Sequence, residues 1–131
     1  MKIEELAALI EGEVIVKHSK ENHQITHAFT SDLMSDVLTI NHQDSTVLLT
    51  GLANVQTIRT AEMANLCIIV LVRGKKTSPE MIEIALDNDI VIIETKFSAF
   101  RASAVLSNNF LNQKSSIFYI FLNILLIKNL K

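Results

Sequence analysis

Three runs of consecutive apolar residues constrain the fold of this chain more than any other feature of its sequence. They occupy residues 46–50, 67–72 and 90–93. A strand with one solvated face would alternate apolar and polar residues, whereas continuous apolar runs are typical of parallel strands covered on both faces. Apolar residues at helical spacing fill the intervals between the runs. This alternation predicts right-handed βαβ units and an α/β fold. The fold is expected to have three layers, α/β/α, in which the middle layer is a mainly parallel sheet.

Residues that favour helix ends mark the helices between these strands. Asn54 is expected to cap the first of them. Ser78 caps the next, with Pro79 at its first position, and Asn88 is expected to end it in the left-handed conformation. A last helix is expected over residues 97–108. The side chains expected to face the core from the first two helices are Val55, Ile58, Ala61, Leu66, Ile82, Ala85 and Leu86.

The first third of the chain has a weaker pattern. Helical spacing over residues 3–10 ends at Gly12, and residues 13–17 predict a short strand. A polar loop over residues 18–24 and a further strand over residues 25–30 follow.

A short helix is expected next. Ser31 is its predicted N-cap, and Asp32 suits the positive end of the helix dipole. The apolar side of this helix is expected to consist of Leu33, Met34, Val37 and Leu38.

Composition limits the class of protein. A chain of 131 residues suits one domain, and 49% hydrophobic against 20% charged residues excludes a disordered chain. The net charge of -2 provides no basic field, so nucleic acid is not an expected partner. The lone Cys67 cannot form an internal disulfide and is expected to be a buried, reduced thiol. The amino-terminal residues lack a secretory pattern, which makes the cytoplasm the expected location.

The end of the chain differs sharply in composition from the rest. An apolar tail over residues 111–131 is expected to follow a domain over residues 1–110. The uninterrupted apolar stretch at residues 117–127 is shorter than the ~20 residues that a membrane-spanning helix needs. The tail could pack as a helix on the domain or a partner chain, could have no evolved role, or could touch a membrane. Membrane contact is the least favoured of the three.

Polar residues follow each of the three buried strands. Ligands of parallel α/β sheets bind beyond the carboxyl ends of the strands, where helix N-termini attract anions. Arg73 could bind a carboxylate or phosphate, while Gly51 and Gly74 allow tight turns or a close approach of the backbone. The alternative is that these loops are polar only because they are solvated. The candidate ligand-binding residues are Ser31, Asp32, Thr50, Gly51, Asn54, Thr57, Arg73, Gly74, Lys75, Thr95 and Lys96.

No catalytic or metal-binding set emerges from the sequence. Residues 74–77 read GKKT, but a phosphate-binding P-loop would need Gly at 69 and Ser or Thr at 76, where the chain has Ile69 and Lys76. Asp32 and Asp36 are expected on one helical face without a partner base. The chain is therefore expected to have no enzymatic activity, no metal and no cofactor. The histidines, which have no metal-site spacing, are His18, His23, His27 and His42.

Two segments resemble the DRTGG domain. They are ITHAFTSDLMSDVLT at residues 25–39 and the stretch over residues 47–106, which contains TGLANVQTIRTAEM, VRGKK and ETKFSAF. The resemblance extends from Met1 to about Leu106. The namesake motif is poorly kept, because residues 22–28 read NHQITHA and only Thr26 matches it. DRTGG domains accompany phosphotransacetylases and CBS-pair pyrophosphatases, and they resemble the amino-terminal region of HPr kinase/phosphorylase.

This resemblance implies a bacterial regulatory or assembly module that is commonly a homodimer. The leading hypothesis is a non-catalytic domain that senses a nucleotide or phosphorylated metabolite at the strand ends and regulates a partner enzyme or kinase. The alternative is a pure protein–protein interaction module without a ligand.

Overall fold

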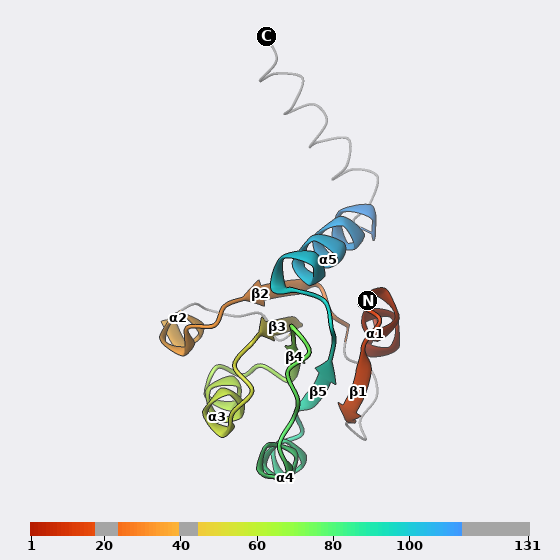
Figure 1. Cartoon of the computed structure of the whole chain (residues 1–131). Helices are drawn as coiled ribbons and strands as arrows, with labels where there is room; N and C mark the ends of the chain where they lie inside the picture. Colours follow the sequence, from red (N-terminus) through yellow and green to blue (C-terminus); the bar gives the residue numbers. More distant parts are fainter. Residues whose placement is uncertain (18–23, 40–44, 114–131) are drawn as a thin grey trace.

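The computed structural model describes residues 1–17, 24–39 and 45–113, which form a five-stranded sheet with helices on both faces (Figure 1). The strand order is β1-β5-β4-β3-β2. Strands β2 to β5 are parallel, and β1 pairs antiparallel with β5. The predicted α/β fold with a mainly parallel sheet is confirmed. The elements are α1 (Ile3–Leu9), β1 (Glu13–Val16), β2 (His27–Thr30), α2 (Met34–Thr39), β3 (Thr46–Thr50), α3 (Val55–Met63), β4 (Ile68–Leu71), α4 (Pro79–Asp87), β5 (Val91–Glu94) and α5 (Ala99–Gln113).

The three apolar runs are the three central strands, as predicted. Every residue of β3, β4 and β5 is buried. Ile69 lies opposite Leu48 on one side and Ile92 on the other. The continuous apolar pattern is thus explained by burial, because these strands lie in a parallel sheet that is covered on both faces.

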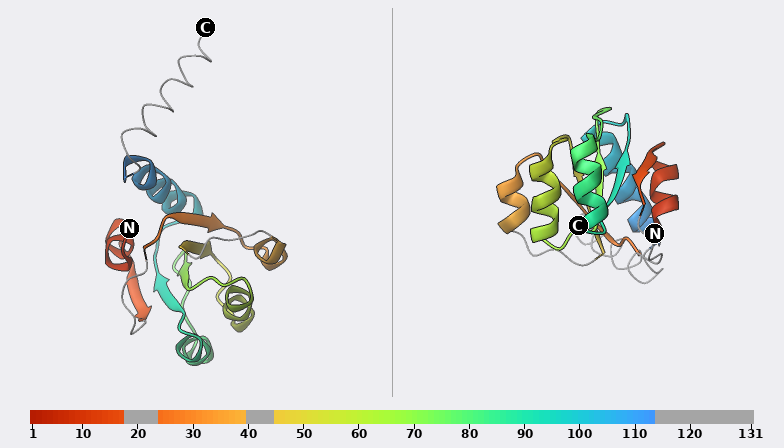
Figure 2. Two further views of the ribbon diagram at one scale, coloured as in Figure 1. Left: turned by 180° about the vertical axis from the view of Figure 1, so that it is seen from behind. Right: turned by 90° about the horizontal axis from the view of Figure 1, so that it is seen from below.

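Helices cover the two faces of the sheet unequally. Figure 2 shows α2, α3 and α4 side by side on one face, while Figure 1 shows α1 and α5 on the other. Alternate strand residues serve the two cores, because side chains of a strand point to opposite faces. Leu48 and Ile92 pack toward α3 and α4, whereas Val47 and Ile93 pack toward α1 and α5.

The predicted caps of the two central helices are confirmed. The Asn54 Oδ1 accepts from the Thr57 N–H at 2.9 Å, and the Ser78 hydroxyl accepts from the Met81 N–H at 3.2 Å. The predicted end of α4 is displaced by one residue. Asn88 keeps a negative φ of -115°, and Asp89 takes the left-handed conformation with φ 56°.

The predicted cap of α2 is wrong. The helix begins at Met34, and the Ser31 hydroxyl accepts from the Leu33 N–H at 3.0 Å, one residue before the helix. Asp32 also precedes the helix, so it does not share a helical face with Asp36 as predicted. The helix begins later than predicted because Asp32 binds the Gly51 N–H at the end of β3, and this contact holds residues 31–33 in an irregular turn.

Three leucines that were expected to face the core are exposed. They are Leu33, Leu38 and Leu86. In α2, which is only six residues long, burial is confined to Met34 and Val37. In α4 the inward side is formed by Met81 and Ala85, and residue 86 lies about 100° further round the helix.

The structure also bears on the predictions for Cys67 and the last helix. Cys67 is only partly buried, although full burial was expected, because it precedes β4 at the rim of the core. The last helix, α5, continues to Gln113. No described helix is long and apolar enough to cross a membrane. The predictions for residues 18–23, for His42 and for the tail from residue 114 onward lie outside the described residues.

Candidate functional site

The carboxyl ends of β3, β4 and β5 meet at one edge of the sheet, as predicted. Backbone hydrogen bonds continue past the strands themselves. The Val72 N–H donates to the Thr50 carbonyl at 3.0 Å, and the Gly74 N–H donates to the Thr95 carbonyl at 2.9 Å. The loops that follow the three strands are thus fixed next to one another.

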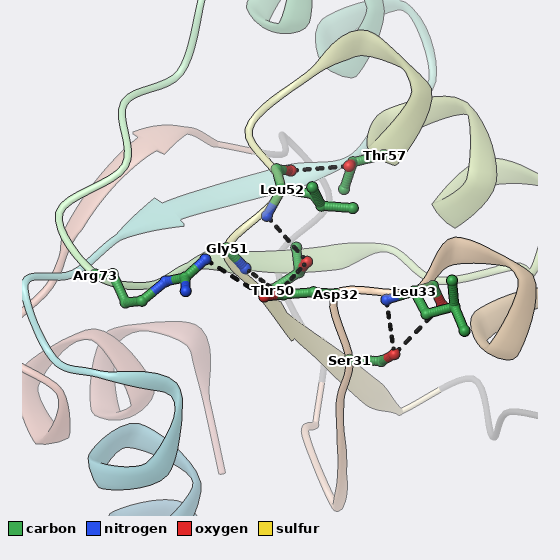
Figure 3. A network of polar contacts seen from close by, with 8 residues as sticks. All are labelled: Ser31, Asp32, Leu33, Thr50, Gly51, Leu52, Thr57 and Arg73. Carbon is green, nitrogen blue, oxygen red and sulfur yellow. Dashed lines mark hydrogen bonds and ion pairs between the residues drawn. The ribbon is translucent and has the colours of Figure 1, made fainter.

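The centre of this edge is a group of four residues that we call the Asp32 cluster: Asp32, Thr50, Gly51 and Arg73 (Figure 3). One carboxylate oxygen of Asp32 accepts from the Gly51 N–H at 2.6 Å and from the Thr50 hydroxyl at 3.2 Å. The other oxygen pairs with Arg73 Nη2 at 3.3 Å. Sequence reasoning selected all four residues, and the structure brings them together.

Gly51 is required by the position of the Arg73 side chain. A Cβ atom at residue 51 would lie 2.0 Å from Arg73 Nη2 and 2.7 Å from its Cζ, so the guanidinium rests directly on the glycine. Arg73 itself has a left-handed backbone with φ 60°, and its N–H donates to the Phe97 carbonyl at 2.8 Å. Gly74 follows with φ 69°. This turn aims Arg73 back across the end of β3.

The other polar residues of the first loop shape its backbone. The Leu52 N–H donates to the Thr50 hydroxyl at 3.2 Å, and the Thr57 hydroxyl donates to the Leu52 carbonyl at 2.8 Å. Asn54 caps α3. These contacts hold the loop in the form that presents the Gly51 N–H to Asp32.

A second carboxylate at this edge was missed by the sequence reasoning. Glu94, Lys76 and Thr77 form what we call the Glu94 cluster. Glu94 Oε2 accepts from the Thr77 N–H at 2.7 Å and from its hydroxyl at 2.8 Å, and Oε1 pairs with Lys76 Nζ at 3.3 Å. The available signal was an acid at the end of an otherwise apolar run, which must find donors if it is buried.

The environment of Glu94 changes its acidity. Burial by itself would raise the pKa of this carboxyl, but the hydrogen bonds from the Thr77 N–H and hydroxyl and the nearby Lys76 outweigh it. The net result is a pKa below the ordinary value, so the buried group is held in its charged form.

The remaining predicted residues of this edge lie elsewhere around it. Thr95 is buried, and its hydroxyl donates to the Ile10 carbonyl at 2.6 Å on the α1 side of the sheet. Lys75 and Lys96 are exposed on the two neighbouring loops. They add positive charge to an edge that already carries Arg73.

The chemistry available at this edge is the binding of anions. In the Asp32 cluster a backbone N–H, a hydroxyl and a guanidinium all bind the carboxylate of Asp32, and donors of these kinds also bind phosphates. In the part of the chain that the structure describes, no three His, Cys, Asp or Glu side chains gather into a metal site.

Comparison with known proteins identifies a neighbour in fold. It is the structure of the CBS and DRTGG domains from the regulatory region of the Clostridium perfringens pyrophosphatase, in complex with its activator diadenosine tetraphosphate. The TM-score is 0.64 at 15% sequence identity, and the match covers 79% of this chain and 45% of that one. The present chain therefore spans less than half of its neighbour, which is a regulatory region. No protein-family model matches the sequence, and no curated protein sequence does.

Proposed function

We propose that the chain is a non-catalytic regulatory module of the DRTGG type that senses a small anionic ligand at the carboxyl ends of its parallel strands. The ligand class is a nucleotide or a phosphorylated metabolite, and the regulated target is a partner enzyme. The observation that carries this proposal is the Asp32 cluster, in which three donors from the ends of β3 and β4 converge on the carboxylate of Asp32. The fold of a nucleotide-regulated neighbour supports it.

The residues of the module have distinct roles in this proposal. Arg73 supplies a charged fork of donors, and the Gly51 N–H supplies a fixed donor at the end of β3. Lys75 and Lys96 extend the positive charge toward further phosphates of a nucleotide. Thr95 contributes only to the fold, because its hydroxyl is bonded to Ile10.

A thermal-shift screen of the full chain against nucleotides and phosphorylated metabolites tests the proposal. A ligand at one hundred times its dissociation constant should stabilise the fold by ~2.7 kcal/mol. Arg73→Ala should abolish that stabilisation, whereas Arg59→Ala, which removes an exposed arginine from α3, should preserve it. A folded protein that no member of the screen stabilises would contradict ligand sensing.

Strand β2, which lies at the side of the sheet and not at the carboxyl ends of the strands, favours a second candidate function, that of a protein interaction module. Strand β2 lies at the end of the strand order, and three of its four residues are exposed. A groove of about 300 Å³ runs between β2 and α5. A strand at the edge of a sheet can pair with a further strand, here from a second copy of the chain. The groove is lined by Ala28, Thr30, Ser103, Ser107, Phe110 and Leu111.

Sedimentation over a range of concentrations tests this second candidate. A dimer should form in the wild-type chain and dissociate in Ala28→Lys, because a charged side chain at an edge strand opposes further pairing. Glu13→Lys, on the opposite edge strand β1, is the matched control and should leave the dimer intact. A wild-type chain that remains monomeric at every concentration would exclude the interaction module.

A further inference from the structure

The anion position of the Asp32 cluster is already filled by a residue of the chain. The Gly51 N–H has one hydrogen, and it is donated to Asp32 Oδ1 at 2.6 Å. The same oxygen accepts from the Thr50 hydroxyl, and Arg73 Nη2 pairs with Oδ2 (Figure 3). A ligand that uses these three donors must therefore remove the Asp32 carboxylate from them.

Exposure of the two charged side chains makes such a replacement feasible. The side chain of Asp32 is 52% exposed and that of Arg73 is 51% exposed. An ion pair this open to solvent contributes little to stability, so breaking it costs little. The incoming phosphate carries more charge and more acceptor oxygens than the carboxylate that it replaces.

Asp32 lies just before α2, the shortest of the helices in the part of the chain that the structure describes. It lies two residues before α2, whose six residues are anchored by the buried side chains of Met34 and Val37. The segment before the helix is held at one end by the Ser31 N–H, which donates to the Leu49 carbonyl at 3.1 Å. Release of Asp32 removes its contacts to Thr50 and Gly51, so the segment before α2 keeps only the Ser31–Leu49 hydrogen bond among the described contacts to β3.

On this basis we propose that Asp32 is an internal competitor of the ligand, and that α2 is the element that responds when the ligand displaces it. This inference rests on the proposed function and adds to it how the site is regulated. Asp32 sets the concentration at which the ligand binds, and the release of α2 changes the surface that the module presents to its target.

Titration calorimetry with ADP and with inorganic phosphate on the full-length chain tests the inference. Asp32→Asn should bind at least one of these probes about tenfold more tightly than the wild type, within the usual range of coupling between sites. Asp36→Asn removes the same charge from the exposed side of α2 and should bind like the wild type. Amide NMR spectra should show α2 resonances of the wild type shifting on ligand addition toward their positions in unliganded Asp32→Asn.

Each result decides between the two levels of the proposal. A wild-type chain that binds a probe, together with an Asp32→Asn variant that binds it equally or less tightly, overturns the competitor role and leaves the proposed function standing. Equal gains in Asp32→Asn and Asp36→Asn also overturn it, since they would show a general effect of charge. Absence of binding in the wild type and in Asp32→Asn overturns both. If Asp32→Asn binds a probe more tightly than the wild type and Asp36→Asn does not, the result supports both the competitor role and the proposed function.

Discussion

The Asp32 and Glu94 clusters have almost the same donors in very different surroundings. Each carboxylate accepts from one backbone N–H at 2.6–2.7 Å, from one threonine hydroxyl and from one cationic side chain at 3.3 Å. The side chain of Asp32 is 52% exposed, whereas that of Glu94 is 9% exposed. The carboxylate is therefore open to solvent in the Asp32 cluster and buried in the Glu94 cluster.

Burial determines what each cluster can do. The ion pair between Asp32 and Arg73 is exposed, so water can replace each partner and the pair can be broken and remade at small cost, whereas Thr50 and Gly51, which also donate to Asp32, are buried. Loss of the Glu94 carboxylate, which is itself buried, would leave the partly buried N–H and hydroxyl of Thr77 without their acceptor. We therefore propose that Glu94 stabilises the loop before α4, and that Asp32 is the carboxylate that a ligand can displace.

The largest expected effect is that of Glu94→Ala. This change should lower the free energy of unfolding by about 2 kcal/mol, because it leaves partly buried donors unsatisfied. Asp32→Ala should lower it by less than about 1 kcal/mol, because water can enter the space left by the half-exposed carboxylate and accept from the Thr50 hydroxyl and the Gly51 N–H. Urea unfolding followed by circular dichroism measures both values. Equal losses in the two variants would break the distinction drawn from burial.

The pH dependence of stability should separate the clusters next. The pKa of Glu94 is lowered in the folded state, so its contribution is fully present above the pKa of the unfolded chain, roughly 4.3 for a glutamate. That contribution is lost as the pH falls through the lower folded value. Wild-type stability should thus decline toward that of Glu94→Gln in acid, while the difference between them stays constant from pH 6 to pH 8, about two units above the unfolded pKa. A difference that grows in acid would contradict the lowered pKa.

The sequence predicted the part of the molecule in which local pattern and tertiary packing agree. Continuous apolar runs specified β3, β4 and β5, and the caps at Asn54 and Ser78 specified where two helices begin. Adjacent strand ends followed from the parallel order, which is why Gly51 and Arg73 were selected together. The local rules were sufficient here because each residue is controlled by neighbours in sequence or by a regular sheet.

Predictions failed where a long-range contact overrides a local preference. Ser31 and Asp32 have the composition of a helix start, but Asp32 is drawn to Gly51, nineteen positions away, and the helix begins later. Glu94 was overlooked because its donors follow the preceding strand, seventeen positions earlier. Leu38 is apolar yet exposed, since α2 lies beside the edge strand β2 and only one side of it meets the core, and Leu33 is exposed in the turn before this helix.

Two glycines provide a smaller and more local test of the comparison. An added Cβ at Gly12 would lie 2.9 Å from Ile93 Cγ2 and 3.0 Å from the Glu94 carbonyl oxygen, which belongs to the sheet and cannot easily withdraw. Gly12→Ala should therefore cost about 1 kcal/mol, the lower end of the usual range for overpacking. At Gly51 the clash is with the flexible end of Arg73, which can swing away. Gly51→Ala should change stability by less than about 1 kcal/mol while abolishing ligand binding. Comparable losses of stability at both sites would show that the Arg73 side chain is fixed.

The smallest expected effect is that of salt on the Asp32 cluster. Attraction between exposed charges is screened within about 3 Å in 1 M salt, against about 10 Å in 0.1 M, so the Asp32–Arg73 pair should weaken as salt is added. The difference in stability between wild type and Asp32→Asn should fall from about 0.5 kcal/mol in low salt toward zero in high salt. The corresponding difference for Glu94→Gln should persist in 1 M salt, because hydrogen bonds to a buried carboxylate are screened far less. A salt-independent contribution from Asp32 would mean that its hydrogen bond to Gly51, rather than its charge, holds it in place, and that a ligand would have to supply a better acceptor and not merely a stronger anion.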